Sequence, residues 1–254
     1  MISKAEIKRI HALRAKKQRD ESGLFVVEGE KMVAEALASG FEVENVYRTE
    51  DIGEEAMSRI TMLSSPSPAL AVVRIPQSPS KDDIDALIAS KPLCLALDSV
   101  RDPGNLGTIV RIADWFGIDA IFASPDTVEL YNPKTVQATM GAIFRRKVIY
   151  CALPAVARRF TEAGMPVYGT FLDGSDIYKE DLSSSGLIVM GSESNGIGAE
   201  MAARVTHRLF IPPYPRKSEG GSESLNVAIA TAVTCAIFRG GSAPTPRRSA
   251  LAIH

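Results

Sequence analysis

LCLALDSVRDPGNLGTIVR, residues 93–111, is the stretch of sequence that decides the fold. It opens with five apolar residues, 93–97, and a run of this kind predicts a strand buried on both faces. Turn-forming residues fill positions 98–105, and apolar residues then recur at helical spacing, which predicts a helix over 106–116. A buried strand that leads through a tight turn into a helix is typical of a parallel sheet covered by helices.

The same alternation continues towards the carboxyl-terminal end of the chain. Apolar runs predict further strands at 120–123, 147–150, 167–171, 187–190 and 208–211. Segments with helical periodicity lie between or after them, at 134–144, 155–163, 199–203 and 225–239. The fold class expected here is therefore α/β, with a mostly parallel sheet covered on both faces.

A smaller α/β unit precedes this alternation. Ser3 and Glu6 form a capping-box pattern, which predicts a helix from residue 3 to residue 19. Further strands are expected at 24–27, 43–48 and 69–75, and further helices at 29–39 and 54–63. Prolines and serines in 76–80 mark a linker, and a helix is expected at 81–89.

The composition is that of a soluble globular protein, with 45% hydrophobic and 23% charged residues. No apolar run reaches the roughly 20 residues that a membrane helix needs, and charges occupy the start of the chain, where a signal peptide needs an apolar stretch. We therefore expect a cytoplasmic protein without a membrane partner. Cys94, Cys151 and Cys235 form no CxxC pair, and only three histidines are present. The cysteines are expected to be small buried hydrophobes, and no metal site is expected.

The net charge of −1 conceals an uneven distribution. Residues 1–20 contain seven lysines and arginines against two acidic residues, a local net charge of +5. Further basic clusters occur at 145–147, 158–159, 204–208, 216–217 and 247–248. Segregated charge favours a surface that binds a polyanion such as nucleic acid. The alternative, that these residues only solvate helix faces, stays open.

Residues 189–198, VMGSESNGIG, are a second apolar strand that runs directly into a glycine-rich loop. The glycines either let a ligand approach the backbone or simply make the turn. The stretch is not a GxGxxG dinucleotide fingerprint, a P-loop or a GxSxG nucleophile elbow. Glu193 in this loop either binds a ligand or caps a short helix.

Four other polar residues have both a structural and a functional interpretation. Asn105 caps a helix or faces a ligand, because ligands of parallel sheets bind at the carboxyl ends of the strands. Arg111 forms a surface salt bridge or contacts the same ligand. Ser224 suits the N-cap of the last helix. Asn226 lies in the first turn of that helix among apolar neighbours, where a polar side chain requires a specific partner.

Taken together, these segments resemble the SpoU (TrmH-like) family of RNA ribose 2′-O-methyltransferases, within the SPOUT superfamily. The family motifs occur in order: N-x-G-x-x-x-R at 105–111, G-x-E-x-x-G at 191–196, and Ile-Pro followed by S-L-N-V-A at 211–212 and 224–228. The resemblance covers residues 91–241. The segment 213–223, between the two parts of the third motif, is longer than is common in the family.

The resemblance implies a trefoil-knotted α/β methyltransferase domain, a fold that no pattern of polar and apolar residues would suggest. It implies S-adenosylmethionine as the cofactor, and a homodimer formed through this domain. Matching the motifs residue by residue assigns cofactor contacts to Thr170, Phe171, Leu172, Gly191, Ile211 and Leu225. Residues 1–76 resemble a ribosomal-protein-like RNA substrate-binding domain, 77–90 are a linker, and 242–254 are expected to be a mobile tail.

The resemblance also implies the catalytic residues, which are Asn105, Arg111, Glu193, Ser224 and Asn226. Arginine stays protonated in proteins, so Arg111 is expected to bind a phosphate and to assist loss of the 2′-hydroxyl proton rather than to act as a base. The other four would orient ribose and cofactor. Two alternatives are a catalytically silent RNA-binding or ribosome-assembly factor and a nicotinamide-dependent enzyme, and the latter lacks its glycine fingerprint. Ribosomal and transfer RNA both remain open as substrates.

Overall fold

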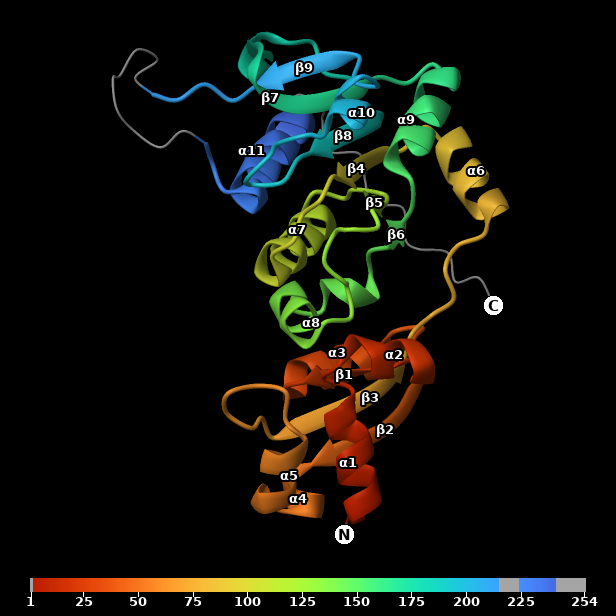
Figure 1. The fold of residues 1–254 in the computed structure, drawn as a ribbon, viewed down its shortest axis with the longest axis vertical. Helices are drawn as coiled ribbons and strands as arrows, with labels where there is room; N and C mark the ends of the chain where they lie inside the picture. Colours follow the sequence, from red (N-terminus) through yellow and green to blue (C-terminus); the bar gives the residue numbers. More distant parts are fainter. Residues whose placement is uncertain (1, 215–223, 241–254) are drawn as a thin grey trace.

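The computed structural model describes residues 2–214 and 224–240, which form two units stacked along the long axis of the molecule (Figure 1). The strands are β1 Leu24–Glu28, β2 Val43–Arg48, β3 Ala69–Arg74, β4 Leu93–Leu97, β5 Ile121–Ala123, β6 Val148–Tyr150, β7 Val167–Asp176, β8 Gly186–Met190 and β9 His207–Phe210. The α-helices are α1 Lys4–Ala12, α2 Lys16–Ser22, α3 Glu30–Ala38, α4 Thr49–Ile52, α5 Glu54–Ile60, α6 Lys81–Ala89, α7 Pro103–Trp115, α8 Pro133–Thr139, α9 Leu153–Glu162, α10 Ala199–Ala202 and α11 Val227–Gly240. Two 3₁₀ turns complete the set, η1 Ala142–Phe144 and η2 Ile177–Lys179.

The smaller unit is built on an antiparallel sheet in the order β1-β3-β2. Side chains of β1 alternate between its two faces, as the pleat requires. Leu24 and Val26 pack with apolar residues of α1 and α5, whereas Phe25 and Val27 pack with residues of α3. The second face belongs to the same continuous core as the larger unit, so the two units share apolar contacts.

The helix predicted over residues 3–19 is in fact two helices, α1 and α2. Ser3 caps α1 as expected, its hydroxyl accepting a hydrogen bond from the Glu6 amide at 3.1 Å. The chain then turns at residues 13–15, and the guanidinium of Arg19 donates to the carbonyls of Leu13 and Arg14, at 2.6 and 2.8 Å. Arg19 thus satisfies carbonyls at the end of α1, and it is buried rather than presented to solvent.

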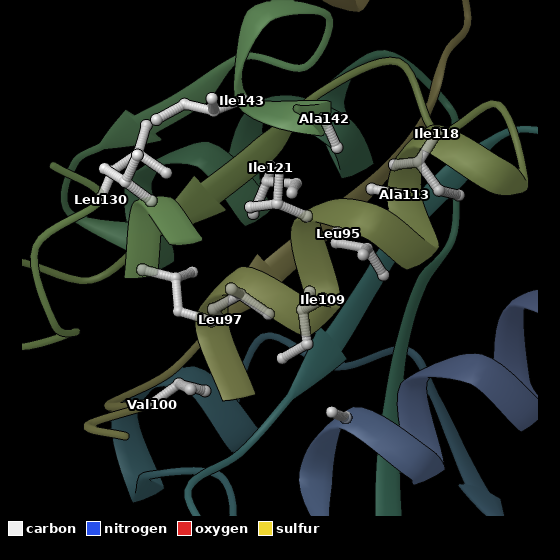
Figure 2. Packing of buried hydrophobic residues seen from close by; sticks show 14 of the residues in the cluster. Leu95, Leu97, Val100, Ile109, Ala113, Ile118, Ile121, Leu130, Ala142 and Ile143 are labelled. Atoms are coloured by element: carbon white, nitrogen blue, oxygen red, sulfur yellow. The ribbon is translucent and has the colours of Figure 1, made fainter. Parts of the chain in front are cut away.

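The larger unit is a parallel sheet in the order β6-β5-β4-β8-β7-β9, which confirms the predicted α/β class. Alternate residues of β4 face opposite sides of this sheet. Leu95 and Leu97 lie on the face covered by α7 and α8, in one core with Ile109 of α7 and Ile121 of the neighbouring strand β5 (Figure 2). Cys94 and Ala96 point to the other face, which α6, α9 and α10 cover.

The helix predicted over 134–144 is interrupted. Helix α8 ends at Thr139, Met140 and Gly141 adopt positive φ values of 49° and 91°, and η1 follows. A Cβ atom at Gly141 would overlap the carboxylate of Glu35 in α3, so glycine allows the smaller unit to approach closely here. The interruption therefore belongs to the contact between the units.

Ion pairs and aromatic contacts fix the two units to each other. Arg19 donates two hydrogen bonds, of 2.9 and 2.6 Å, to the carboxylate of Glu129. Phe25 lies 4.7 Å from Tyr131, measured between ring centroids. Arg145, just after η1, pairs with Glu35 at 2.5 Å. These contacts place α8 and η1 against α2, α3 and β1 (Figure 1). Within the described ranges, no helix is both long and apolar enough to cross a membrane.

Candidate active site

The first motif connects β4 to α7, and the structure corrects the expected capping of this helix. Helix α7 begins at Pro103, three residues before the expected start, and Asp102 is its N-cap, accepting a hydrogen bond from the Asn105 amide at 2.8 Å. Proline fits the first helical position because its missing N–H has no intrahelical partner there. Asn105 therefore does not cap the helix, and its side chain is available for other contacts.

The second motif is a tight turn after β8. Ser192 and Gly196 pair through backbone hydrogen bonds of 3.0 and 2.9 Å, and a Cβ at Gly191 would overlap the Gly196 backbone. Strand β8 lies beside β4 in register, with Met190 opposite Leu97. The loops that follow the two strands consequently meet, and the Asp98 carboxylate accepts a hydrogen bond from the Gly198 amide at 2.7 Å.

The third motif caps the last helix, but through a different residue from the one expected. The Oδ1 atom of Asn226 accepts hydrogen bonds from the amides of Ala228 and Ile229, at 2.9 and 3.3 Å. Asn226 is thus the N-cap of α11, so the structural interpretation of Ser224, as the cap of this helix, does not hold. Ser224 is exposed two residues earlier.

Three of the predicted catalytic residues form one chain of hydrogen bonds. Asn226 donates from Nδ2 to Oδ1 of Asn105 at 3.0 Å, and Asn105 donates from Nδ2 to the carboxylate of Glu193. The direction is dictated by the partners. Helix amides require the oxygen of Asn226 on one side, so its NH₂ faces Asn105, whose own NH₂ then faces Glu193. Glu193 is therefore neither a helix cap nor unpartnered.

Arg111 lies two turns further along α7 and is exposed to solvent. It forms no ion pair within the part of the chain that the structure describes, so the alternative of a surface salt bridge finds no support there. A guanidinium carries five N–H donors in a planar fork, which matches the oxygens of a phosphate. Arg111 thus presents to solvent a guanidinium that can bind an anion, six residues along α7 from Asn105.

The predicted cofactor residues come from three neighbouring strands and from the start of α11: Thr170, Phe171 and Leu172 lie within β7, Gly191 and Ile211 directly follow β8 and β9, and Leu225 lies two residues before α11. Gly169 pairs with Val189, and Thr170 pairs with Leu209, so residues 170–172 approach Gly191 and Ile211. Among the described residues, Gly191, Ile211 and Leu225 form no backbone hydrogen bonds. Their amides and carbonyls are available to a ligand, which suits a site that binds through backbone groups.

Strand β7 departs from the predicted range 167–171, because it continues to Asp176 after a register shift between Thr170 and Ser175. Within this irregular segment the Phe171 ring lies 3.5 Å from the guanidinium carbon of Arg208, which also pairs with Asp173 at 2.5 Å. Leu172, by contrast, is 69% exposed. The segment is therefore held to β9 by Phe171 and Asp173 and presents Leu172 to solvent.

One part of the site was not predicted from the sequence. Ser99, directly after β4, has a φ of 62°, which is unusual for a residue with a side chain. Its hydroxyl donates to the carboxylate of Asp126 at 2.6 Å, and hydrogen bonds from Ser99 and Ser124 lower the pKa of Asp126. Polar residues directly after a buried strand were the available signal. They hold the loop before Asp102 in place.

Other predicted features have simple outcomes. Cys94 and Cys235 are buried, and burial raises the pKa of each thiol to about 12, so both behave as small hydrophobes. Cys151 is only partly buried. In the described part of the chain, no group of three His, Cys, Asp or Glu side chains is arranged to hold a metal ion. Most of segment 213–223 and the whole of 242–254 lie outside the described residues.

Comparison with known proteins gives consistent matches over most of the chain. Residues 92–236 match the SpoU rRNA methylase family, and residues 4–73 match the MRM3-like substrate binding domain. The Bacillus subtilis 23S rRNA (guanosine(2553)-2′-O)-methyltransferase RlmP is 31% identical over 244 residues, covering 90% of this chain and 93% of that protein.

Two solved structures share the complete fold. A TrmH-family protein from Porphyromonas gingivalis superposes with a TM-score of 0.82 at 35% identity, covering 95% of this chain and 100% of that one. An AdoMet-bound rRNA methyltransferase from Sinorhizobium meliloti superposes with a TM-score of 0.80 at 29% identity, covering 94% and 97%.

Proposed function

Since the chain belongs to the SpoU rRNA methylase family, we propose that it transfers a methyl group from S-adenosylmethionine to a ribose 2′-hydroxyl of ribosomal RNA. The observation that carries this proposal is the hydrogen-bonded chain from Asn226 through Asn105 to Glu193, with the free Arg111 on the same helix as Asn105. Every polar residue of the three motifs is retained, which favours an enzyme over a catalytically silent RNA-binding or assembly factor.

Arg111 has the central role in the proposed mechanism. The ribose 2′-hydroxyl must lose a proton while its oxygen attacks the methyl carbon, and a guanidinium is too weak a base to take that proton. Arg111 instead binds the phosphate next to the ribose and stabilises negative charge as it develops on the oxygen, and the phosphate accepts the proton. Correct placement of the reacting atoms supplies much of the remaining rate enhancement.

The other motif residues are positioning residues in this proposal. Asn226 and Glu193 hold Asn105 from both sides, which fixes the orientation of its side-chain amide. Ser224 is exposed, so its hydroxyl is available to the RNA. Pre-organised polar groups of this kind do not have to reorganise during the reaction, which is why they lower its barrier.

The residues within β7, directly after β8 and β9 and just before α11 fit S-adenosylmethionine, which supplies an electrophilic methyl group when bound. Thr170, Phe171, Leu172, Gly191, Ile211 and Leu225 are the residues assigned to it. Unpaired backbone groups of Gly191 and Ile211 would hold the polar parts of the cofactor, and the exposed side chains of Leu172 and Leu225 would cover its apolar surface. The trefoil knot expected around this site belongs to the same proposal.

Methyl transfer by the purified protein tests the proposal. With in vitro transcribed 23S rRNA and methyl-tritiated S-adenosylmethionine, we expect the label in a dinucleotide that resists alkaline hydrolysis, because a methylated 2′-oxygen cannot attack the adjacent phosphodiester. Arg111→Ala should abolish transfer while S-adenosylmethionine still raises the melting temperature of the variant. Arg111→Lys should also lose most activity, because an ammonium lacks the planar fork of donors. Near-normal turnover in either variant would refute the role given to Arg111.

We also propose a homodimer formed by α7 and α11. The two helices run side by side in the same direction: Asn226 contacts Asn105 at their starts, and Arg239 donates to the carbonyls of Phe116 and Gly117 at their ends. Trp115 is 80% exposed and Ile229 is 53% exposed on these helices, which is unusual for large apolar side chains. Sedimentation of Trp115→Glu as a monomer would support this face as the interface.

The proposal also assigns a role to each segment of the chain. Residues 1–76 bind substrate RNA, 77–90 connect the units, and 91–241 carry the methyltransferase site, in a protein that works in the cytoplasm. The match of residues 4–73 to a substrate-binding domain supports the first assignment. Loss of RNA affinity without loss of cofactor affinity, in a chain lacking residues 1–76, is the expected result.

A further inference from the structure

A groove lined by positive charge lies between α1 and α5, on the smaller unit. Its volume is about 520 Å³, and its lining residues are Lys4, Ile7, Lys8, His11, Arg14, Ser58 and Arg59. No acidic side chain lines the groove in the described part of the chain. Four permanent cations and a histidine therefore face one recess of a protein whose overall net charge is −1.

The groove lysines differ from the lysines of α2 because they have no acidic partner among the described residues. Lys16 and Lys17 pair with Asp20 and Glu21, at 2.6 and 3.8 Å. Lys4 and Lys8, in contrast, form no ion pair within the described ranges. Like charges four residues apart on a helix repel each other, and a lysine in the first turn opposes the helix dipole. An arrangement that costs stability in this way requires an anionic partner to be useful.

The basic side chains of the groove are arranged in a row along α1 rather than gathered at one point. Lys4, Lys8 and His11 follow each other at intervals of four and three residues, so they share one face of α1 and extend over roughly 10 Å of its axis. The floor is rigid, because Ile7 packs into the core shared by α1, α5 and the sheet. Arg14 is fixed at one end by a hydrogen bond to the Thr61 carbonyl. A row of cations on a rigid floor suits a chain of anions.

We propose that the α1–α5 groove binds successive phosphates of the substrate RNA. This inference rests on the proposed function and specifies where the smaller unit makes its contact. Helices α1 and α5 lie at the end of the molecule furthest from β7 and β9 (Figure 1). An RNA that reaches both the groove and the methyl-transfer site is therefore an extended folded RNA. Because phosphates carry no sequence information, the groove selects the position of the RNA rather than its bases.

The proposal also narrows the basic surface expected over residues 1–20 to part of that segment. Lys16, Lys17 and Arg19 are the basic residues at the end of the single helix that the sequence predicts. The first two are neutralised by α2 itself, and Arg19 is buried against Glu129. The RNA-binding surface consequently moves from α2 to the facing sides of α1 and α5.

A charge-matched pair of variants tests the groove. The groove variant is Lys4→Gln/Lys8→Gln/Arg59→Gln, which leaves Arg14 and its hydrogen bond intact. The control is Lys16→Gln/Lys17→Gln/Arg158→Gln, which removes the same charge from residues that each pair with an acid four positions away. Binding of in vitro transcribed 23S rRNA is measured between 50 and 200 mM salt, together with kcat and KM for methyl transfer.

Each cation that no longer neutralises a phosphate should reduce the slope of log affinity against log salt by roughly 0.7–0.9, so the triple substitution should reduce it by about 2.1–2.7. Over a fourfold change in salt, wild-type affinity should then fall about 18- to 42-fold more than that of the groove variant. At 50 mM salt the variant should show a raised KM with an unchanged kcat, and the control should behave as wild type. Equal slopes for all three proteins, or an equal reduction in the control, would overturn the proposal. If wild-type protein shows the groove-dependent slope but transfers no methyl group, the proposed function fails and the groove stands.

Discussion

Asn226 has two separable tasks, to cap α11 and to orient Asn105, and three substitutions distinguish them. Its Oδ1 atom caps the helix and its Nδ2 atom donates to Asn105. Asn226→Ala removes both groups. Asn226→Asp and Asn226→Ser keep an oxygen for the helix amides but lose the Nδ2 amide that donates to Asn105, and only the first of them adds a charge.

The expected magnitudes follow from these contacts. Loss of the cap should cost about 1 kcal/mol, so Asn226→Ala should lower Tm by roughly 2–4 °C in a chain of this size. The serine and aspartate variants should stay within about 1 °C of wild type, since both residues are good caps. In all three, Asn105 loses its donor partner and no longer holds its amide towards Glu193. A hydrogen bond to a carboxylate contributes about 1.5 kcal/mol at the low end of its range, which corresponds to roughly a tenfold loss in kcat.

Differential scanning fluorimetry and single-turnover methyl transfer on 23S rRNA would measure the two effects independently. The decisive result is the serine variant, which adds no charge: it should keep its Tm and lose activity. Wild-type kcat in both Asn226→Ser and Asn226→Asp would show that the chain of hydrogen bonds plays no part in catalysis. An unchanged Tm in Asn226→Ala would show that the cap does not stabilise α11.

Three further predictions concern the larger unit. Gly107→Ala would place a Cβ 2.5 Å from the nearest side-chain atom of α8 and 2.6 Å from a backbone carbonyl. This overpacking should cost about 1–3 kcal/mol of stability and lower Tm. Gly40→Ala is the control, because the space around Gly40 is open and Tm should not fall. Burial opposes ionisation of Asp114, but hydrogen bonds from the arginines at 145–146 outweigh it and lower its pKa. Asp114→Asn should therefore destabilise the protein at neutral pH. The difference in urea midpoint between wild type and this variant should shrink as the pH falls through the acidic range, because the wild-type carboxylate becomes protonated. Trp115 is the single tryptophan and is 80% exposed, so its emission should shift to shorter wavelength with rising protein concentration if α7 forms the dimer interface, and a concentration-independent spectrum would argue against it.

Local patterns predicted the α/β class and most of the elements, because burial of strands and helix faces leaves a direct periodic signal. The ranges of β2, β4 and α6 agree with prediction to the residue. The errors occurred where a partner distant in sequence decides the local structure. Arg19 satisfies the carbonyls at the end of α1 while pairing with Glu129, 110 residues away, and nothing near residue 19 indicates either contact.

The candidate site shows the same limit. Motif spacing singled out Asn105, Glu193 and Asn226, which the structure joins by hydrogen bonds, but residue type alone suggested Asn105 and Ser224 as possible caps, and neither is one. Asp102 and Asn226 are the caps, and both Asp102 and Asn105, like Ser224 and Asn226, are chemically suited to the task. Which of two suitable residues caps a helix depends on where the preceding strand ends and on which side chain finds another partner. That information lies in the tertiary structure.

The chain of hydrogen bonds has a consequence for synthesis of the protein on the ribosome. One of its hydrogen bonds joins residues that are 88 positions apart in the sequence, and the other joins residues that are 121 positions apart. Asn226, the member nearest the carboxyl terminus, caps a helix that ends at Gly240. The antiparallel sheet of the smaller unit, by contrast, is complete at Arg74. At about 5–20 residues per second, the 166 residues between these points take roughly 8–33 s to emerge. During that interval the nascent chain carries its basic groove but lacks a methyl-transfer site, so it can meet RNA well before it can modify any.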